Sequence, residues 1–149
     1  MSNPDPRPIH ILLVEDSDAD IEMTRYAFEQ GRIRNTMWVC KDGADALAYL
    51  NKKGPHADAV RPDLILLDLN LPRILGHDVL RTLRAHPDRE VANIPVVVLT
   101  TSQADDDVHR AYSAHANAFI SKPVDHNEFL RVVRETGKYW VTVVRLPPG

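Results

Sequence analysis

The chain has 149 residues, 44% of them hydrophobic and 26% charged, and its formal net charge is −3. These values fit one globular domain and exclude collagen-like, disordered and disulfide-rich proteins. Basic residues are scattered, the amino end lacks the apolar stretch of a signal peptide, and no apolar run reaches the roughly 20 residues that cross a bilayer. We therefore expect a cytoplasmic protein that binds neither nucleic acid nor membrane.

Five short apolar runs alternate along the chain with segments of helical spacing. The runs are HILLVED, TMWVCKD, DLILLDL, IPVVVLT and AFISKPV. This βα repetition predicts an α/β fold, with a five-stranded parallel sheet and helices on both faces. Residues 11–14, 64–67 and 96–99 are continuously apolar, as strands buried on both faces should be. Residues 1–8 are expected to form a flexible amino-terminal segment.

Capping pairs and glycines indicate where helices begin and end. The capping pairs are Ser17 with Asp20, Ser102 with Asp105, and Asp125 with Glu128. Glycines 31, 43, 54 and 137 fall where helices or strands are expected to end. The connection of residues 51–62 exceeds the usual length of about two to six residues, and we interpret it as a surface insertion in preference to a contact loop.

Polar side chains follow four of the five predicted strands. They are Glu15 and Asp16 after the first, Asp68 after the third, Thr100 and Thr101 at the fourth, and Lys122 with Pro123 after the fifth. In such sheets ligands bind beyond the carboxyl ends of the strands. Clustered carboxylates repel one another, and a hard divalent cation relieves that repulsion.

The residue types suit magnesium-dependent phosphoryl transfer. Mg²⁺ prefers oxygen ligands, which Asp16, Asp68 and the backbone carbonyl of Asn70 can supply, with Glu15 reaching it through water. Once the cation has neutralised the charge of the cluster, the Asp68 carboxylate can attack phosphorus. Lys122 and the Thr100 hydroxyl would then hold the phosphoryl oxygens. Taken singly, each residue is more simply a helix cap or a loop former, so the hypothesis depends on the whole set.

From about Ile9 to Gly137 the chain resembles the receiver domain of response regulators. VEDS at residues 14–17 is similar to the family's acidic pair, LLDLNLPRILG at 66–76 to its phosphoacceptor segment, VVVLT at 96–100 to its switch-hydroxyl strand, and SKP at 121–123 to its lysine motif. The resemblance implies a flavodoxin-like strand order 2-1-3-4-5 and phosphorylation on Asp68. It also places Phe119 at the aromatic switch position and implies a cis bond between Lys122 and Pro123.

The resemblance further implies a signalling protein that promotes its own Mg²⁺-dependent phosphorylation and dephosphorylation and is not an enzyme with an outside substrate. We expect a single-domain regulator without an output domain, phosphorylated by a sensor histidine kinase. An alternative is a phosphate shuttle that passes the group to a histidine phosphotransfer protein.

Residues 138–149 form an apolar extension, KYWVTVVRLPPG, which either covers the protein's own core or supports self-association. This tail, the long loop and the LTTS sequence are similar to regulators paired with bacterial phytochromes. We therefore expect a phytochrome-class kinase and a homodimer formed by the tail with the face of the fourth helix, fifth strand and fifth helix.

Other functions fit the sequence less well. The haloacid dehalogenase phosphatases carry a second carboxylate where Asn70 stands, and a flavin carrier needs a glycine- or hydroxyl-rich first turn instead of EDSDAD. An adaptor that acts only by binding, with a degenerate site, remains an alternative function. We interpret Cys40 as a buried hydrophobe and expect the histidines, which show no metal-ligand spacing, to be solvated.

Overall fold

The computed structural model describes residues 8–101 and 104–142, with side chains up to Trp140. The elements in chain order are β1 (Ile9–Val14), α1 (Asp18–Gln30), β2 (Asn35–Cys40), α2 (Gly43–Leu50), the 3₁₀ helix η1 (Gly54–His56), β3 (Leu64–Leu67), α3 (Gly76–Arg84), α4 (Arg89–Ala92), β4 (Val96–Thr100), α5 (Asp105–Ser113), β5 (Ala118–Ser121) and α6 (His126–Thr142). Within these described ranges, no helix is both long and apolar enough to cross a membrane.

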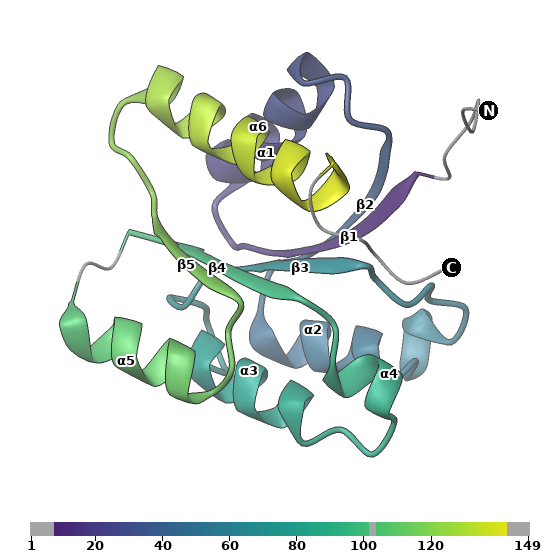
Figure 1. The fold of residues 1–149 in the computed structure, drawn as a ribbon. Helices are drawn as coiled ribbons and strands as arrows, with labels where there is room; N and C mark the ends of the chain where they lie inside the picture. The colour runs from purple at the N-terminus through teal and green to yellow at the C-terminus, as the bar shows by residue number, and fades with distance from the viewer. Residues whose placement is uncertain (1–7, 102–103, 143–149) are drawn as a thin grey trace.

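The five strands form one parallel sheet in the order β2-β1-β3-β4-β5, which confirms the predicted topology. Helices α1 and α6 cover one face, and α2, α3, α4 and α5 cover the other (Figure 1). The register pairs Val14 with Leu67 and Leu67 with Val98, so the central strands end at nearly the same level. This alignment places the residues that follow each strand at one edge of the sheet.

The strands β1, β3 and β4 are buried on both faces, as their continuous apolar runs predict. Alternate residues of β1 and β3 point to opposite sides: Leu12 and Leu67 belong to the core beneath α2–α5, whereas Leu13 and Leu66 belong to the core beneath α1 and α6. All four are at most 3% exposed. The two cores hold the strand ends rigidly.

Two of the three predicted helix caps are confirmed. The Ser17 hydroxyl accepts a hydrogen bond from the Asp20 N–H at 3.2 Å. At the start of α6 the Asp125 carboxylate accepts from the N–H groups of Asn127 and Glu128 at 2.7 and 3.2 Å. The third predicted cap, Ser102, lies outside the described residues.

The expectation that Gly137 ends the last helix is wrong, because α6 continues to Thr142. A Cβ atom at Gly137 would lie 2.8 Å from Ile33 Cδ1 and 2.9 Å from Phe28 Cε2. The glycine therefore permits close packing of α6 against the other helix on its face. Trp140 is 8% exposed and belongs to that core, so this part of the apolar extension covers the protein itself. Residues 143–149 lie outside the described residues.

The connections hold two short helices that the βα repetition does not predict. Helix α4 precedes β4, and the Asp88 carboxylate caps it by accepting from the Glu90 N–H at 2.9 Å. Helix η1 lies inside the long connection of residues 51–62. Because of α4, the fourth and fifth helices of the expected dimer face correspond to α5 and α6.

We predict that Val98→Ala lowers the free energy of unfolding by about 2 kcal/mol, because it removes two buried methyl groups and leaves a cavity. Val98 is 0% exposed, whereas Val124 is 98% exposed and provides the matched control. Urea unfolding followed by circular dichroism measures both variants. Equal losses in Val98→Ala and Val124→Ala would contradict the described core.

Candidate functional site

The candidate site lies where β1, β3, β4 and β5 end. Glu15 and Asp16 follow β1, Asp68 follows β3, Thr100 ends β4, and Lys122 follows β5. The Asp68 N–H donates to the Val14 carbonyl at 3.0 Å, and the Lys122 N–H donates to the Thr100 carbonyl at 2.7 Å. The sheet ladder therefore continues into the site and fixes the backbone of its residues.

Three carboxylates make up the acidic part of the site. Glu15, Asp16 and Asp68 each place one oxygen atom within 4.8 Å of an oxygen of the other two. Glu15 and Asp68 are only 3% and 7% exposed, whereas Asp16 faces solvent. Negative charges held this close repel one another, and either a cation or the protonation of one carboxyl group relieves that repulsion.

Lys122 supplies one positive charge from the opposite side of the cluster. Lys122 is 7% exposed, and its ammonium donates to the carboxylates of Glu15, of Asp68 at 3.0 Å, and of Asp20 at 2.8 Å. The contact with Asp20 is absent from the sequence prediction, which assigned that residue only to the cap of α1. Asp20 lies in the first turn of α1, which begins just after β1 ends, and this place in the chain is the signal that indicates its nearness to the site.

Asp68 is held by donors from three segments. The Asn70 N–H donates to Asp68 Oδ1 at 3.1 Å, and Lys122 holds Oδ2. The Thr100 hydroxyl, which is fully buried, also hydrogen-bonds this carboxylate. The described contact of Asn70 is thus through its N–H, and the role of its carbonyl as a metal ligand stays a prediction.

These contacts shift the pKa values of the two buried carboxylates, Glu15 and Asp68, in opposite directions. Burial raises the pKa of Glu15 to about 7, although Lys122 opposes the shift. Burial would also raise the pKa of Asp68, but the Asn70 N–H, Lys122 and Thr100 together outweigh it and hold that pKa below its ordinary value. Burial would lower the pKa of Lys122, yet its hydrogen bonds to Asp20 and Glu15 raise it above the ordinary value. At neutral pH the Asp68 carboxylate is therefore ionised beside a charged ammonium, which is the state in which a carboxylate can act as a nucleophile.

Gly76 lets the chain fold back onto the segment that carries Asp68. Its N–H donates to the Leu69 carbonyl at 3.0 Å. A Cβ atom at this position would lie 2.5 Å from the Asp68 carbonyl oxygen and 2.6 Å from Leu69 Cα, both backbone atoms that cannot move aside. The glycine in the LLDLNLPRILG motif is thus a packing requirement of the site.

Phe119, the predicted switch aromatic, is half-buried on β5 and packs against the core beneath α2–α5. Its N–H donates to the hydroxyl of Tyr112 on α5 at 3.1 Å. This contact links the strand that leads to Lys122 with a surface helix. A rotation of the ring on phosphorylation stays a prediction.

The expected cis bond between Lys122 and Pro123 is wrong, because the described residues contain only trans peptide bonds. Trans is the intrinsically favoured form by about 0.5–1 kcal/mol even before proline. Lys122 reaches the carboxylates from this trans geometry.

Two histidines also differ from their expected solvated positions. His56 and His77 are 6% and 5% exposed, and each places Nε2 near a carboxylate, of Asp45 at 2.7 Å and of Asp107 at 3.1 Å. Their burial depends on tertiary partners that are distant in the sequence, so spacing alone does not reveal it.

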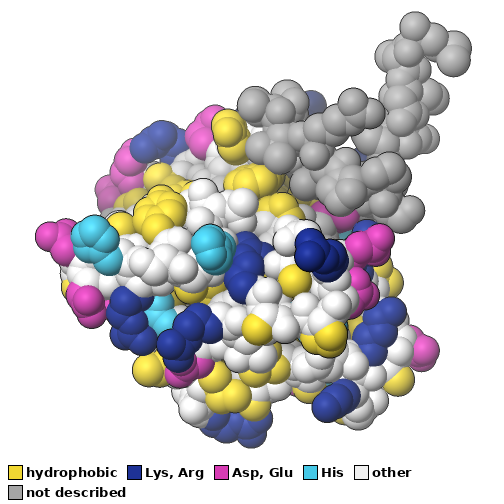
Figure 2. All heavy atoms as spheres, turned by 60° about the horizontal axis from the view of Figure 1, so that its bottom comes forward, with side chains coloured by type: hydrophobic (Ala, Val, Ile, Leu, Met, Phe, Trp, Pro, Cys, Tyr) yellow, Lys and Arg dark blue, Asp and Glu magenta, His cyan; other side chains and the backbone are white. Residues whose placement is uncertain are grey.

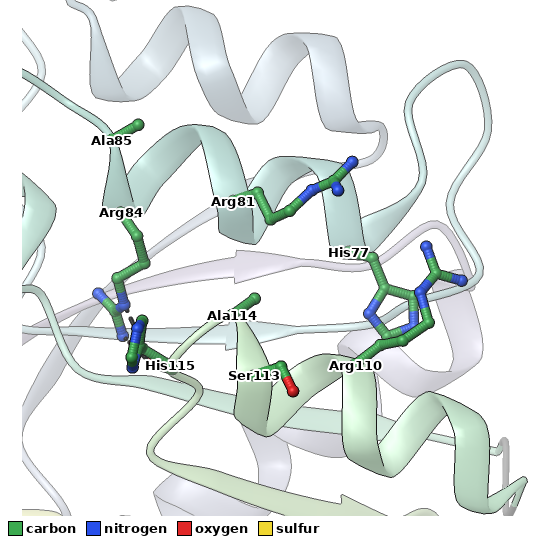
Figure 3. Close-up of a pocket in the computed structure, with 8 residues that line it drawn as sticks. All are labelled: His77, Arg81, Arg84, Ala85, Arg110, Ser113, Ala114 and His115. Carbon is green, nitrogen blue, oxygen red and sulfur yellow. Dashed lines mark hydrogen bonds between the residues drawn. The ribbon is translucent and has the colours of Figure 1, made fainter.

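A separate hollow of about 470 Å³ lies between α3 and α5 on the face shown in Figure 2. His77 and Arg110 lie at one end of it, and Arg84 and His115 at the other (Figure 3). Arg84 donates to the backbone carbonyls of Ala92, Ile94 and His115 and so holds the loops that flank β4 and β5. This hollow is lined by none of the acidic site residues, and Arg84 has a structural role there.

The chain is similar to known proteins over nearly its whole length. Residues 11–134 match the family model of the response regulator receiver domain. The response regulator Rcp1 of Synechocystis sp. is 38% identical, over 99% of this chain and 99% of that protein. The probable methanogenesis regulatory protein FilR2 of Methanothrix harundinacea is 41% identical, over 94% of this chain and 88% of that protein.

Solved structures agree with these relatives. The phosphorylated cyanobacterial phytochrome response regulator RcpA matches with a TM-score of 0.89 and 38% identity, covering 95% of this chain and 99% of that chain. The Mn²⁺-bound form of the response regulator Rcp1 also matches with a TM-score of 0.89 and 38% identity, covering 95% of this chain and all of that chain.

We predict that Lys122→Met lowers the free energy of unfolding by about 3 kcal/mol in the absence of divalent cations, because buried carboxylates lose their only described cationic partner. Lys41→Met is the control, since Lys41 pairs with the exposed Asp18 and should contribute at most about 0.5 kcal/mol. Urea unfolding in a chelating buffer measures both. Similar losses in the two variants would show that Lys122 does not neutralise the cluster.

Proposed function

The chain belongs to the response regulator receiver family, and from that premise we propose that it is a single-domain response regulator that accepts a phosphoryl group on Asp68. The observation that carries this proposal is the environment of Asp68. Its carboxylate is buried and ionised, lies 3.0 Å from the Lys122 ammonium, and accepts a hydrogen bond from the Thr100 hydroxyl. A helix cap or turn former needs none of these contacts.

Mg²⁺ fits the acidic part of this site. The three carboxylates offer hard oxygen donors within 4.8 Å of one another, and Glu15, Asp16 and Asp68 would hold the ion. When bound, the cation would neutralise the cluster and draw charge from the phosphoryl oxygens. The Mn²⁺-bound form of the similar regulator Rcp1 supports a divalent cation in this type of domain.

The chain's own residues account for the transfer step. A carboxylate oxygen of Asp68 attacks the phosphorus of a phosphohistidine or a small acyl phosphate. A new P–O bond forms as the bond to the leaving group breaks, and the leaving group keeps the electron pair. Lys122 and Thr100 already contact Asp68, so they can follow the phosphoryl oxygens without a large rearrangement.

Phosphorylation would change the face formed by α5, β5 and α6. Thr100 ends β4, and its neighbour in the sheet, Ser121, belongs to the same strand as Phe119. A shift of Thr100 towards the phosphoryl group would therefore alter the packing around Phe119 and its Tyr112 contact. This face is the proposed surface through which the regulator reports its state.

A sensor histidine kinase of the phytochrome class is the proposed phosphoryl donor, and the cytoplasm the proposed place of action. The similarity to the phytochrome response regulator RcpA supports this kinase class. The comparable identity to FilR2, named for methanogenesis, shows that the receiver itself is shared with regulators of other processes. The class of kinase that donates the phosphoryl group is therefore selected by the surface of the chain more than by the residues around Asp68.

We also propose a homodimer through the α5–β5–α6 face. A hollow of about 500 Å³ there is lined by residues of β5 and α6, among them Ile120, Tyr139 and Trp140. Tyr139 is 52% exposed beside it. An aromatic side chain of this kind is suited to the centre of an interface.

Acetyl phosphate with Mg²⁺ should add one phosphoryl group to the protein, as measured by intact mass spectrometry, and a chelator should prevent it. Asp68→Asn should abolish the addition, because the nucleophilic carboxylate is lost. Asp106→Asn, at an exposed position of α5, is the matched control and should retain full labelling. Labelling that persists in Asp68→Asn would contradict the proposed acceptor.

For the dimer, light scattering at tens of micromolar should give twice the chain mass, and Tyr139→Glu should give a monomer because a charge would be buried at the interface. Tyr26→Glu is the control, since Tyr26 on α1 is 51% exposed, nearly the same as Tyr139. A monomer mass for the unmodified chain, phosphorylated or not, would overturn the dimer.

A further inference from the structure

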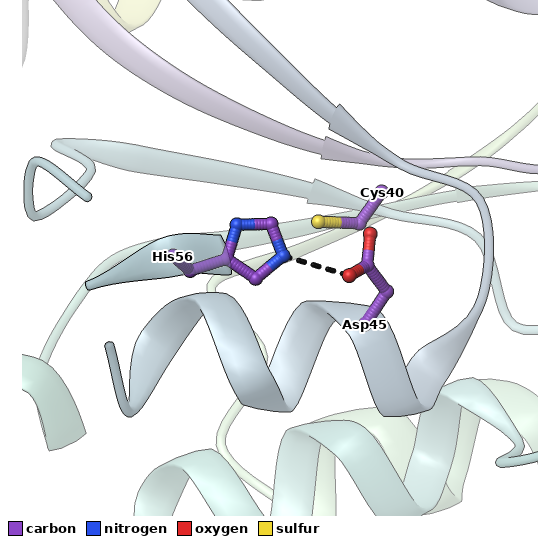
Figure 4. Close-up of side chains that lie close together, drawn as sticks. All are labelled: Cys40, Asp45 and His56. Carbon is purple, nitrogen blue, oxygen red and sulfur yellow. Dashed lines mark hydrogen bonds and ion pairs between the residues drawn. The ribbon is translucent and has the colours of Figure 1, made fainter. Parts of the chain in front are cut away.

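A second cluster of metal-ligating side chains lies apart from the acidic site. Cys40 ends β2, Asp45 lies in the first turn of α2, and His56 ends η1 (Figure 4). One ligand atom of each residue lies within 4.8 Å of those of the other two. Cys40 is 0% and His56 6% exposed, so the sulfur and the imidazole meet inside the protein.

The three side chains lie close together. His56 Nε2 lies 2.7 Å from Asp45 Oδ1, and Cys40 Sγ lies within 4.8 Å of a ligand atom of each of them. Asp45 is fixed in turn, because its N–H donates to the carboxylate of Asp42 at 2.8 Å. The three potential ligands are therefore placed by β2, by the start of α2 and by η1.

We propose that Cys40, Asp45 and His56 form a second cation site, which takes a thiophilic divalent transition metal such as Zn²⁺. Sulfur, imidazole nitrogen and carboxylate oxygen are the ligand types that Zn²⁺ combines in proteins, whereas Mg²⁺ takes oxygen alone. A thiolate and a carboxylate carry two negative charges, so a dication leaves the buried site neutral. Three protein ligands leave one tetrahedral position for water.

An aromatic shell orients the imidazole and provides access. The His56 ring lies edge-on to Trp38, with ring centroids 5.8 Å apart, and to Tyr49 at 5.4 Å. The same three residues line a hollow of about 240 Å³. Because His56 lines this hollow, the hollow is the route by which an ion would reach the imidazole.

Metal binding would connect the long insertion to the body of the domain. His56 belongs to residues 51–62, whereas Cys40 and Asp45 belong to the sheet and α2. Binding replaces the thiol proton of Cys40 by the metal and releases that proton to the buffer, with no electron transferred. Without a metal, Cys40 keeps its thiol proton and His56 stays paired with Asp45. The metal-bound state differs by its bond between sulfur and metal, which absorption can detect.

Co²⁺ replaces Zn²⁺ in such sites and reports its ligands by its absorption. The full chain without an affinity tag is titrated with Co²⁺ in saturating Mg²⁺, which occupies the oxygen-only site at Asp68. We expect a sulfur-to-cobalt charge-transfer band and tetrahedral d–d bands that saturate at one equivalent and disappear when Zn²⁺ is added. Absence of the charge-transfer band in the unmodified protein would overturn the site.

Variants assign the ligands. Cys40→Ser should abolish the charge-transfer band, and His56→Gln should weaken Co²⁺ binding by at least about tenfold. His109→Gln, at an exposed position of α5, is the matched control and should leave the titration unchanged. If Cys40→Ser does not fold, Asp45→Asn retains the thiol and should weaken Co²⁺ binding by a similar factor. A charge-transfer band that survives in Cys40→Ser, or unchanged affinity in both His56→Gln and Asp45→Asn, would overturn the proposal.

Discussion

Lys122 places one ammonium among the carboxylates of Glu15, Asp20 and Asp68, and the other features of the site are arranged around this charge. Burying like charges without a partner costs several kcal/mol per ion. The ammonium makes it possible for Asp68 to be both buried and ionised. In the proposed reaction the ammonium would turn from a carboxylate to the oxygens of the incoming phosphoryl group, so the interaction that holds the resting site would also serve its chemistry.

The strand order explains why a lysine has this role. Lys122 follows β5, and β4 and β3 lie between that strand and β1, which leads to Glu15. The long side chain of lysine covers part of this distance, and the side chains of Glu15, Asp20 and Asp68 meet its charged group. Thr100 ends β4, the strand that lies between β3 and β5, and from there it contacts Asp68. A shorter cation at position 122 would not reach all three carboxylates.

The sequence predicts the sheet and the main site residues because both depend on local patterns. Continuous apolar runs identify the buried strands, and parallel strands necessarily bring Glu15, Asp68 and Lys122 to one edge. The sequence does not predict the features that depend on contacts between distant segments. Asp20 meets Lys122 only after folding, Gly137 is small because α6 packs against Phe28 and Ile33, and His56 is buried by β2 and α2.

The claim that Asp68 receives the phosphoryl group is tested most directly by locating the modification. An aspartyl phosphate is reduced by borohydride to homoserine, which peptide mass spectrometry assigns to one position. After incubation with acetyl phosphate and Mg²⁺, the account predicts homoserine at position 68 and unchanged aspartate at positions 16 and 20. Homoserine at another aspartate, or at none, would contradict it.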